Sequence, residues 1–292
     1  MDKIIRANST DGKIRAFGIT HKNLTEKARE IHGTSPVVTA GFGRLMGACL
    51  MMAQTLKGED ETLSLQIKGD GPVGTIVTVS DLSGAVRGYV GNANVDIPLK
   101  SNGKLDVGGS VGKGYLTVVR DLKMKEPYVG RTALVSGEIA EDLTYYFASS
   151  EQTPSIVALG VLVDRDYTVR QAGGYIVQLM PDATDEDIAV LENNINGIKS
   201  VTQLFEDGNS IEDILKMVCK GFTLDFTDEL TPEYRCNCNR DRIERVLISI
   251  GKSEIEDIIK NEGKTSLNCY FCNTDYEFSK EDLEKLLSDI NF

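Results

Sequence analysis

Histidine is nearly missing from this sequence. The chain of 292 residues has two, His21 and His32, and both lie far upstream of a group of four closely spaced cysteines. Any metal that those cysteines hold is therefore expected to have no histidine ligand. A basic surface is missing as well, because 32 lysines and arginines stand against 44 acidic residues and the net charge is −12. Nucleic acids and anionic membranes attract basic surfaces, so this balance argues against both as partners.

A secretion signal is also missing. The first residues, Met1–Arg6, contain no apolar core of the kind that signal peptides carry, so we expect a cytoplasmic protein. One apolar stretch, residues 36–56, is long enough to cross a bilayer, but it contains Arg44, and a charge inside a membrane span is costly. It starts with Pro36, which suits the first turn of a helix. We therefore predict a long buried helix and no membrane contact.

Two glycine-rich stretches imitate nucleotide-binding loops without satisfying their chemistry. Gly69–Gly74 matches G-x-G-x-x-G, but β-branched residues 75–79 follow it, whereas the motif requires a helix N-terminus for the pyrophosphate. Residues 107–114 resemble a Walker A loop, but Val107 replaces its first glycine and Gly114 replaces its serine or threonine. We predict no nucleotide site. No catalytic triad or paired-carboxylate site stands out either, so we do not expect an enzyme.

Two close cysteine pairs are the strongest signal in the sequence. Cys236 and Cys238 form a C-x-C pair, and Cys269 and Cys272 form a C-x-x-C pair. Zinc in structural sites takes four ligands in a tetrahedron, with thiolates at about 2.3 Å, and close pairs supply such ligands two at a time. Cysteines in a reducing cytosol are also more often metal ligands or redox centres than structural disulfides. We predict one Zn²⁺ held by all four thiolates.

Residues 1–180 are predicted to form one α+β domain that is rich in antiparallel strands and built around the long buried helix. Thr62–Lys68 alternates apolar and polar residues, as a half-buried strand does. Asp11 and Gly12 form a strong hairpin-turn signal between two β-like runs. The other predicted strands are Lys3–Ala7, Lys13–Thr20, Thr75–Ser80, Ala85–Val90, Tyr115–Arg120, Val129–Gly137, Val157–Val163 and Tyr175–Leu179.

Residues 181–231 form an acidic segment with helical patterning. Twelve acidic residues and three lysines give this segment a charge of −9 out of the total of −12. Ser200 and Ser210 occupy helix-capping positions, and helices this short are marginal unless their apolar stripe is docked. The stripe is formed by Ile188, Leu191, Ile195, Ile211, Ile214 and Leu215. The segment is either a helical connector packed permanently on the first domain or a metastable linker whose apolar faces can be released.

Residues 232–292 are predicted to form a small unit around the cysteines. Ser253 and Glu256 have the spacing of a capping box for one of its helices. The expected elements are helices over Arg240–Ile250, Ile255–Asn261 and the residues after Ser279, with strands over Thr265–Leu267 and Asp275–Phe278. About sixty residues make a thin core, and modules of this size often need a metal in order to fold.

The predicted zinc site can be a static support or a switch. Oxidants attack thiolates, and sulfurs that have formed disulfides no longer hold the metal. A unit that needs zinc would then unfold, and the acidic segment beside it would lose its docking partner. Apolar helix faces released in this way could bind unfolded segments of other proteins. The residues alone leave both possibilities open.

Several further stretches carry a resemblance to a known family. They are residues 64–74 (SLQIKGDGPVG), 137–146 (GEIAEDLTYY), 149–155 (SSEQTPS) and 173–175 (GGY), together with Phe271, Asn273, Tyr276 and Phe278 around the second cysteine pair. With the four-cysteine spacing, they make the whole chain resemble the heat shock protein 33 family of redox-regulated holdase chaperones.

The resemblance implies a protein that is inactive while reduced and zinc-bound. Oxidation would join Cys236 to Cys238 and Cys269 to Cys272, release the zinc, and unfold the C-terminal domain and the linker. The activated form would be a homodimer that holds unfolding client proteins without ATP. The family architecture matches a chaperone domain over 1–180, a metastable linker over 181–231 and a redox-switch domain over 232–292. Cys49 and Cys219 lie outside the family motif and receive no role.

Other functions fit parts of the sequence. The chain could be a nucleic-acid or protein-interaction module of the zinc-ribbon type with a static structural zinc, because four arginines lie near the first cysteine pair, although Asp241 and Glu244 interleave with them. These arginines are Arg235, Arg240, Arg242 and Arg245. A thiol–disulfide oxidoreductase could use the C-x-x-C pair, but that motif should then begin a helix, whose N-terminal amides lower the pKa of the thiol.

Overall fold

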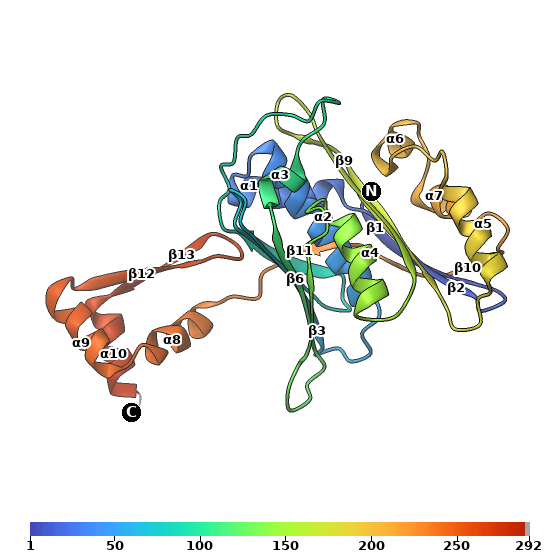
Figure 1. Cartoon of the computed structure of the whole chain (residues 1–292). Coiled ribbons are helices and arrows are strands. Elements are labelled where there is room, and N and C mark those ends of the chain that lie inside the picture. The colour runs from blue at the N-terminus through green and yellow to red at the C-terminus, as the bar shows by residue number, and fades with distance from the viewer. Residues whose placement is uncertain (290–292) are drawn as a thin grey trace. The chain divides into compact units, whose positions relative to one another are not determined.

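Two β-sheets enclose an apolar helix in the larger of two units that make up the chain (Figure 1). The computed structural model describes residues 1–289, and its units are Met1–Tyr234 and a smaller one that begins at Arg235. The first sheet has the strand order β10-β1-β2-β9-β8, and the second has the order β11-β5-β4-β3-β6-β7. Neighbouring strands are antiparallel except for β11 and β5, which are parallel. The α+β prediction is confirmed.

The strands of the first sheet are β10 (Leu224–Leu230), β1 (Lys3–Ser9), β2 (Ile14–Thr20), β9 (Val169–Leu179) and β8 (Ser155–Val163). Those of the second sheet are β11 (Glu233–Tyr234), β5 (Ala85–Val90), β4 (Thr75–Ser80), β3 (Thr62–Gly69), β6 (Gly114–Asp121) and β7 (Tyr128–Ala133). The helices of this unit are α1 (Lys22–His32), α2 (Pro36–Ala53), α3 (Val107–Val111), α4 (Ala140–Ser149), α5 (Asp185–Ile195), α6 (Val201–Glu206) and α7 (Ile211–Val218).

Helix α2 is the predicted buried helix, and it ends at Ala53, three residues earlier than expected. By length and composition it could cross a membrane, yet 89 % of its residues are buried inside the protein. It packs against strands of both sheets, and glycines allow the close contacts. A Cβ atom at Gly47 would lie 2.5 Å from Nε2 of the buried His21. Its environment is that of a core helix, and its apolar composition follows from burial on all sides.

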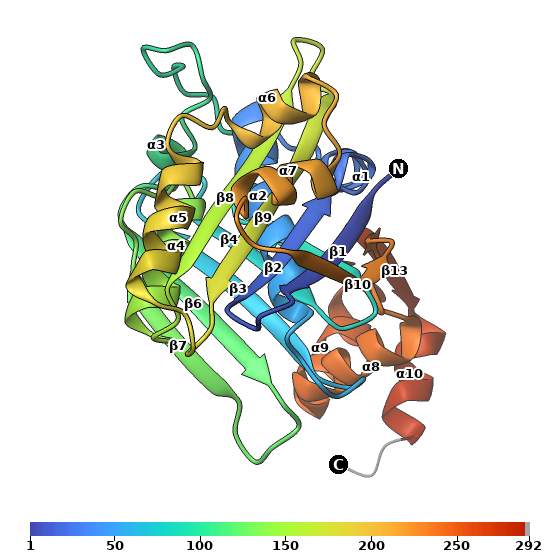
Figure 2. The same cartoon turned by 90° about the vertical axis from the view of Figure 1, so that its right-hand side faces the viewer.

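The first sheet is apolar on both faces because α5, α6 and α7 cover the face that points away from α2 (Figure 2). Alternate residues of β2 show the division: Phe17 and Ile19 face α2, whereas Ile14 and Ala16 face the covering helices. Helix α7 buries four apolar side chains, each worth roughly 1.5–3 kcal/mol on full burial. They are Ile211, Ile214, Leu215 and Val218. Docking therefore holds an eight-residue helix that would be unstable alone.

Glycines in the first sheet bring the covering helices into close contact with its backbone. A Cβ atom at Gly18 would lie 2.5 Å from Cγ1 of Ile211, and one at Gly173 would lie 2.5 Å from the ring of Phe205. Neither glycine has a positive φ angle, so the space, and not the backbone conformation, requires glycine there. These two positions fix how closely α7 and α6 approach the sheet.

Ion pairs tie the acidic helices to basic residues of the same sheet. Each of the three helices contributes one carboxylate, and the pairs are Lys3–Glu212, Lys13–Asp187 and Arg170–Glu206. Lys13 Nζ lies 2.9 Å from Asp187, and the hydrogen bond from this ammonium lowers the pKa of Asp187 to about 2. From the sequence, the negative charges of residues 181–231 are expected to repel one another. The structure shows that three of these carboxylates pair with basic residues where the helices dock.

Parts of the acidic segment differ from the prediction. The caps at Ser200 and Ser210 are present, and their side chains accept hydrogen bonds from Gln203 N and Asp213 N. Residues 224–230, however, form strand β10 on the edge of the first sheet, where no strand was predicted. The structure places residues 181–231 in the same unit as 1–180, and it does not test whether they act as a separate metastable linker, so the three-part division stays a prediction.

The second unit has a small apolar core. Its elements are α8 (Arg240–Ser249), α9 (Lys252–Asn261), β12 (Lys264–Cys269), β13 (Thr274–Ser279) and α10 (Lys280–Asp289). The buried apolar cluster among its described residues consists of Leu247, Ile255, Phe278 and Leu283. The predicted cap at Ser253 is wrong, because α9 begins at Lys252, three residues before the expected start at Ile255, and its N-cap is Gly251 at φ 99°. That backbone conformation suits glycine and ends the preceding turn.

Replacing Gly18 by alanine is expected to lift α7 from the sheet. The added methyl group overlaps Ile211, and overpacking of this kind costs about 1–3 kcal/mol. Amide hydrogen exchange over residues 211–218 should accelerate, while exchange in β3 and β4 stays unchanged. Gly58→Ala is the matched control, because a Cβ atom there meets the side chain of Glu61 alone. Equal exchange in Gly18→Ala and wild type would mean that α7 does not depend on this close contact.

Candidate metal centre

Four cysteine sulfurs converge in the second unit. The Sγ atoms of Cys236, Cys238, Cys269 and Cys272 all lie within 4.8 Å of one another. Cys236 and Cys269 are 3.8 Å apart, and Cys238 and Cys272 are 3.3 Å apart. Sulfurs placed tetrahedrally at about 2.3 Å from one ion lie about 3.8 Å from each other. The four residues predicted from their spacing are thus brought together, and the cluster can hold a metal ion of the size and preference of zinc.

The second cysteine pair is positioned by the turn between β12 and β13. Cys269 O accepts hydrogen bonds from Cys272 N at 3.2 Å and from Asn273 N at 2.7 Å, which folds the chain back on itself. Asn273 adopts a left-handed conformation with φ 56°, which asparagine tolerates better than most residues. The C-x-x-C pair therefore lies in a hairpin turn. It does not begin a helix, which removes the geometric basis of the oxidoreductase alternative.

The first cysteine pair is held by the start of α8. Asn239 caps this helix by accepting a hydrogen bond from Arg242 N at 2.9 Å. Arg240 donates to Glu277 O at 3.0 Å, pairs with Asp282 at 2.9 Å, and stacks 4.4 Å from the ring centre of Phe278. Arg240 thus connects α8 to β13 and α10. This internal role accounts for one of the four arginines that favoured a nucleic-acid module.

Three of the four thiols, Cys236, Cys269 and Cys272, differ in how readily they ionise. Burial raises the pKa of Cys236 and of Cys269. Burial also opposes ionisation at Cys272, but hydrogen bonds with Thr274 and Cys238 outweigh it and lower its pKa to about 7. Metal ligands and nucleophiles are thiolates, and Cys272 forms a thiolate more readily than Cys236 and Cys269 do.

Tyr276 is a neighbour of the cluster that the sequence identified merely as part of the family resemblance. Its Oη lies 3.1 Å from Cys238 Sγ, and this hydrogen bond raises the pKa of Tyr276 to about 12. The phenol therefore stays protonated at neutral pH, and it would donate to the sulfur of a Cys238 thiolate. The sequence does contain a signal for this contact. Tyr276 and the core residue Phe278 are two residues apart in β13, so both side chains lie on the same face of the strand.

The remaining cysteines are chemically different. Cys49 and Cys219 are fully buried among apolar side chains of the first unit, and burial raises the pKa of each to about 12. Both are therefore thiols at neutral pH, and thiols are poor nucleophiles and poor metal ligands. The structure gives neither residue a part in the cluster.

The chain is similar to proteins of one family over nearly its whole length. A family model described as Hsp33 protein matches residues 2–279. The 33 kDa chaperonin of Ruminiclostridium cellulolyticum is 48 % identical over 288 residues, which cover 99 % of this chain and 98 % of the relative. The 33 kDa chaperonin of Lachnoclostridium phytofermentans is 47 % identical over 99 % of both chains. The crystal structure of the Thermotoga maritima heat shock protein 33 homologue superposes with a TM-score of 0.92 at 40 % identity, covering 99 % of this chain and 98 % of that one.

Replacing Tyr276 by phenylalanine is expected to weaken metal binding. The variant keeps the ring but loses the hydrogen bond to Cys238, and loss of a partner of a metal ligand typically lowers affinity 10–100-fold. Titration of the zinc-loaded protein with a colorimetric chelator measures this change directly. Tyr167→Phe removes an exposed phenol from the first unit and serves as the control. Equal zinc retention in Tyr276→Phe and wild type would contradict a supporting role for the phenol.

Proposed function

The chain belongs to the Hsp33 family of chaperones, and from this premise we propose that it is a redox-regulated holdase that binds unfolding proteins without ATP. The observation that carries the proposal is the convergence of four reactive sulfurs in a unit with a thin apolar core. Its relatives are named chaperonins, which is a binding role and not a catalytic one. We further propose that it acts in the cytoplasm.

The reduced state is the inactive one in this proposal. Cys236, Cys238, Cys269 and Cys272 are its zinc ligands, and bound zinc would cross-link the segment before α8 to the β12–β13 hairpin. A cluster of four buried apolar side chains gives this unit little stability of its own, and at such sizes metal binding supplies much of the folding free energy. Fold and ligation are therefore coupled in the second unit.

Oxidation removes the ligands. Two thiols give up two electrons and two protons as their sulfurs join, and hydrogen peroxide accepts these and leaves as two molecules of water. Following the family pattern, the bonds form between Cys236 and Cys238 and between Cys269 and Cys272. The sulfur of Cys272, whose pKa is lowered to about 7, is the one that attacks peroxide most readily. Sulfurs in disulfides cannot hold the metal ion, so the unit unfolds.

Unfolding then propagates to the first unit through a short connection. Strand β11, which ends two residues before Cys236, contains two residues and pairs with the edge strand β5. Its Tyr234 is nevertheless buried, and the phenol donates to Gly88 O at 2.9 Å and is hydrogen-bonded with His32 at 2.7 Å. We propose that loss of the second unit weakens this attachment, then β10, and finally the docked helices.

The client-binding surface is the apolar outer face of the first sheet together with the released helices. Apolar side chains on β1, β2 and β9 form this face, and helices α5, α6 and α7 bury it in the structure. They are Ile5, Ala7, Ile14, Ala16, Tyr175 and Val177. Contiguous exposed apolar surface of this kind binds the apolar segments of unfolding proteins. Two copies of the chain would present twice this surface, and we propose that the active form is a homodimer.

The proposed ATP independence is supported by the glycine-rich run at residues 107–114. The glycine-rich run before β6 forms the short helix α3, and the carboxylate of Asp106 accepts a hydrogen bond from Gly109 N at 2.9 Å. Asp106 thus satisfies the amide to which a nucleotide phosphate would have to bind, and its negative charge repels phosphate.

Oxidation is expected to couple three measurable events. Peroxide added at heat-shock temperature should release zinc, consume four thiols and suppress aggregation of an unfolding client in parallel. The cysteines of the cluster react because as zinc ligands they would be thiolates, whereas the buried thiols Cys49 and Cys219 remain reduced. A colorimetric chelator, thiol titration and light scattering on the same samples follow the three events. Zinc that stays bound, or leaves without protecting the client, would make the site a static structural one.

Charged substitutions in α7 are expected to activate the reduced protein. Aspartate in place of Ile211 or Leu215 would bury an unpaired charge against the sheet, so the helix should undock instead. The reduced variants should suppress client aggregation while their zinc content stays that of wild type. Met217 lies on the same helix but is 40 % exposed, so Met217→Asp is the matched control. Reduced variants that stay inactive although α7 has lost its protection from hydrogen exchange would exclude this surface as the client site.

A further inference from the structure

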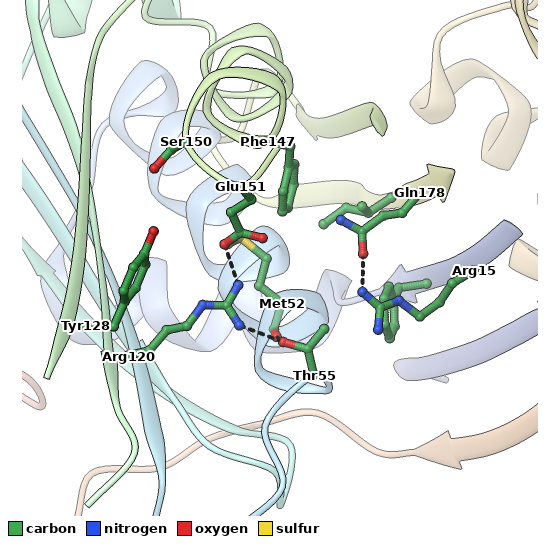
Figure 3. Close-up of a pocket in the computed structure, with 11 residues that line it drawn as sticks. Arg15, Met52, Thr55, Arg120, Tyr128, Phe147, Ser150, Glu151 and Gln178 are labelled. Atoms are coloured by element: carbon green, nitrogen blue, oxygen red, sulfur yellow. Dashed lines mark hydrogen bonds and ion pairs between the residues drawn. The ribbon is translucent and has the colours of Figure 1, made fainter. Parts of the chain in front are cut away.

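A pocket of about 410 Å³ opens between the two sheets, at the C-terminal end of α2 (Figure 3). Strands β2 and β9 of the first sheet line one side, and β6 and β7 of the second sheet line another. Residues 149–155, one of the stretches that carried the family resemblance, contribute Ser150 and Glu151. The proposed chaperone mechanism uses none of this pocket. Its volume lies within the range of about 300–1,000 Å³ that is typical of small-molecule sites.

An arginine ends the inward-facing row of side chains in both sheets. In β2 the inward row reads Ile19, Phe17, Arg15, and in β6 the residues Leu116 and Val118 are followed by Arg120 at the next inward position. The two guanidinium groups reach the same pocket from opposite sides (Figure 3). Charged residues at inward positions of a sandwich are costly unless each of them finds a partner.

The two arginines differ in their partners. Arg120 pairs with Glu151 at 2.5 Å and donates to Thr55 at 3.0 Å, so its charge is neutralised inside the protein. Arg15 donates to the neutral amide oxygen of Gln178 at 2.7 Å. Within residues 1–289, no carboxylate pairs with Arg15, and its buried Nε has no hydrogen-bond partner. Burial, together with the nearby charge of Arg6, lowers the pKa of Arg15.

The rest of the pocket is suited to an apolar body. Phe17, Met52, Phe147 and Ile176 supply apolar wall, and the hydroxyls of Ser150 and Tyr128 add hydrogen-bonding groups. The charges that line the pocket are two arginines and one glutamate, which leaves one uncompensated positive charge in a protein of net charge −12. A guanidinium group binds carboxylates and phosphates through two parallel hydrogen bonds.

We propose that this pocket binds a small organic anion, namely a carboxylate or phosphate monoester carried on an apolar body. The anionic group pairs with the guanidinium group of Arg15. The apolar body packs against Met52 and Phe147. The inference is independent of the proposed chaperone function, because it rests on the first unit alone and involves neither the cysteines nor the covering helices.

The test uses the reduced, zinc-loaded protein and defined probes. 3-Phenylpropionate and phenyl phosphate should bind in isothermal titration calorimetry and raise the melting temperature of the protein. Two control probes should bind at least about tenfold more weakly. They are 3-phenylpropanol, which lacks the anionic group, and inorganic phosphate, which lacks the apolar body. Comparison of phenylpropionate with phenyl phosphate distinguishes the two anionic groups. If neither anion binds, or if 3-phenylpropanol binds as tightly as 3-phenylpropionate, the proposal is wrong.

Two variants connect binding to the pocket. Arg15→Gln should weaken both anionic probes about tenfold or more, since it removes a charged hydrogen-bond donor. Gln178→Glu leaves Arg15 in place but gives it an internal carboxylate, so it should abolish binding and raise the melting temperature in the absence of any probe. Arg165→Gln changes an exposed arginine in the β8–β9 hairpin and should bind like wild type. Unchanged affinity in Gln178→Glu would place the probes elsewhere and overturn the assignment.

Discussion

The outer face of the first sheet has to be covered, and much of the structure follows from this requirement. A sheet with apolar side chains on both faces is stable in water when a second layer packs on each of them. Helix α2 provides that layer on one face with an apolar surface that is buried on all sides. On the other face, three short helices provide it, α5, α6 and α7, and they belong to the acidic segment 181–231. Helix α2 is enclosed by both sheets, whereas the covering helices keep an exposed outer face, and our proposal has them released.

The charge of the covering helices has two consequences. Docked helices use one carboxylate each to pair with Lys3, Lys13 and Arg170 of the sheet. Such exposed pairs contribute about 0–1 kcal/mol each, so they orient the helices more than they hold them. The other acidic residues of residues 181–231 remain in solvent, and in released helices their mutual repulsion would oppose self-association. The acidic residues of this segment thus orient the docked helices, and they would keep released helices from associating with one another.

The sequence predicted those features that depend on neighbours along the chain. Cysteine pairs, the caps at Ser200 and Ser210, and the alternation of β3 are local patterns, and the structure contains all of them. Strand β10 was missed because its acidic sequence has little intrinsic preference for a strand, and pairing with β1 determines it. The close contacts at Gly18 and Gly173 also escaped prediction, because they depend on which helix packs over which strand.

Arginines at inward positions illustrate a different limit of sequence reasoning. The sequence IRAFGIT of β2 identifies a strand, but the face on which Arg15 lies follows from the register of β2 with β1 and β9. Once that register is known, Arg15 and Arg120 become the points where two apolar rows end in positive charge. Arg120 finds its carboxylate in Glu151, which lies in a loop distant in sequence. Arg15 finds an amide in place of a carboxylate, and this half-buried cation with a neutral partner is the basis for the proposed anion site.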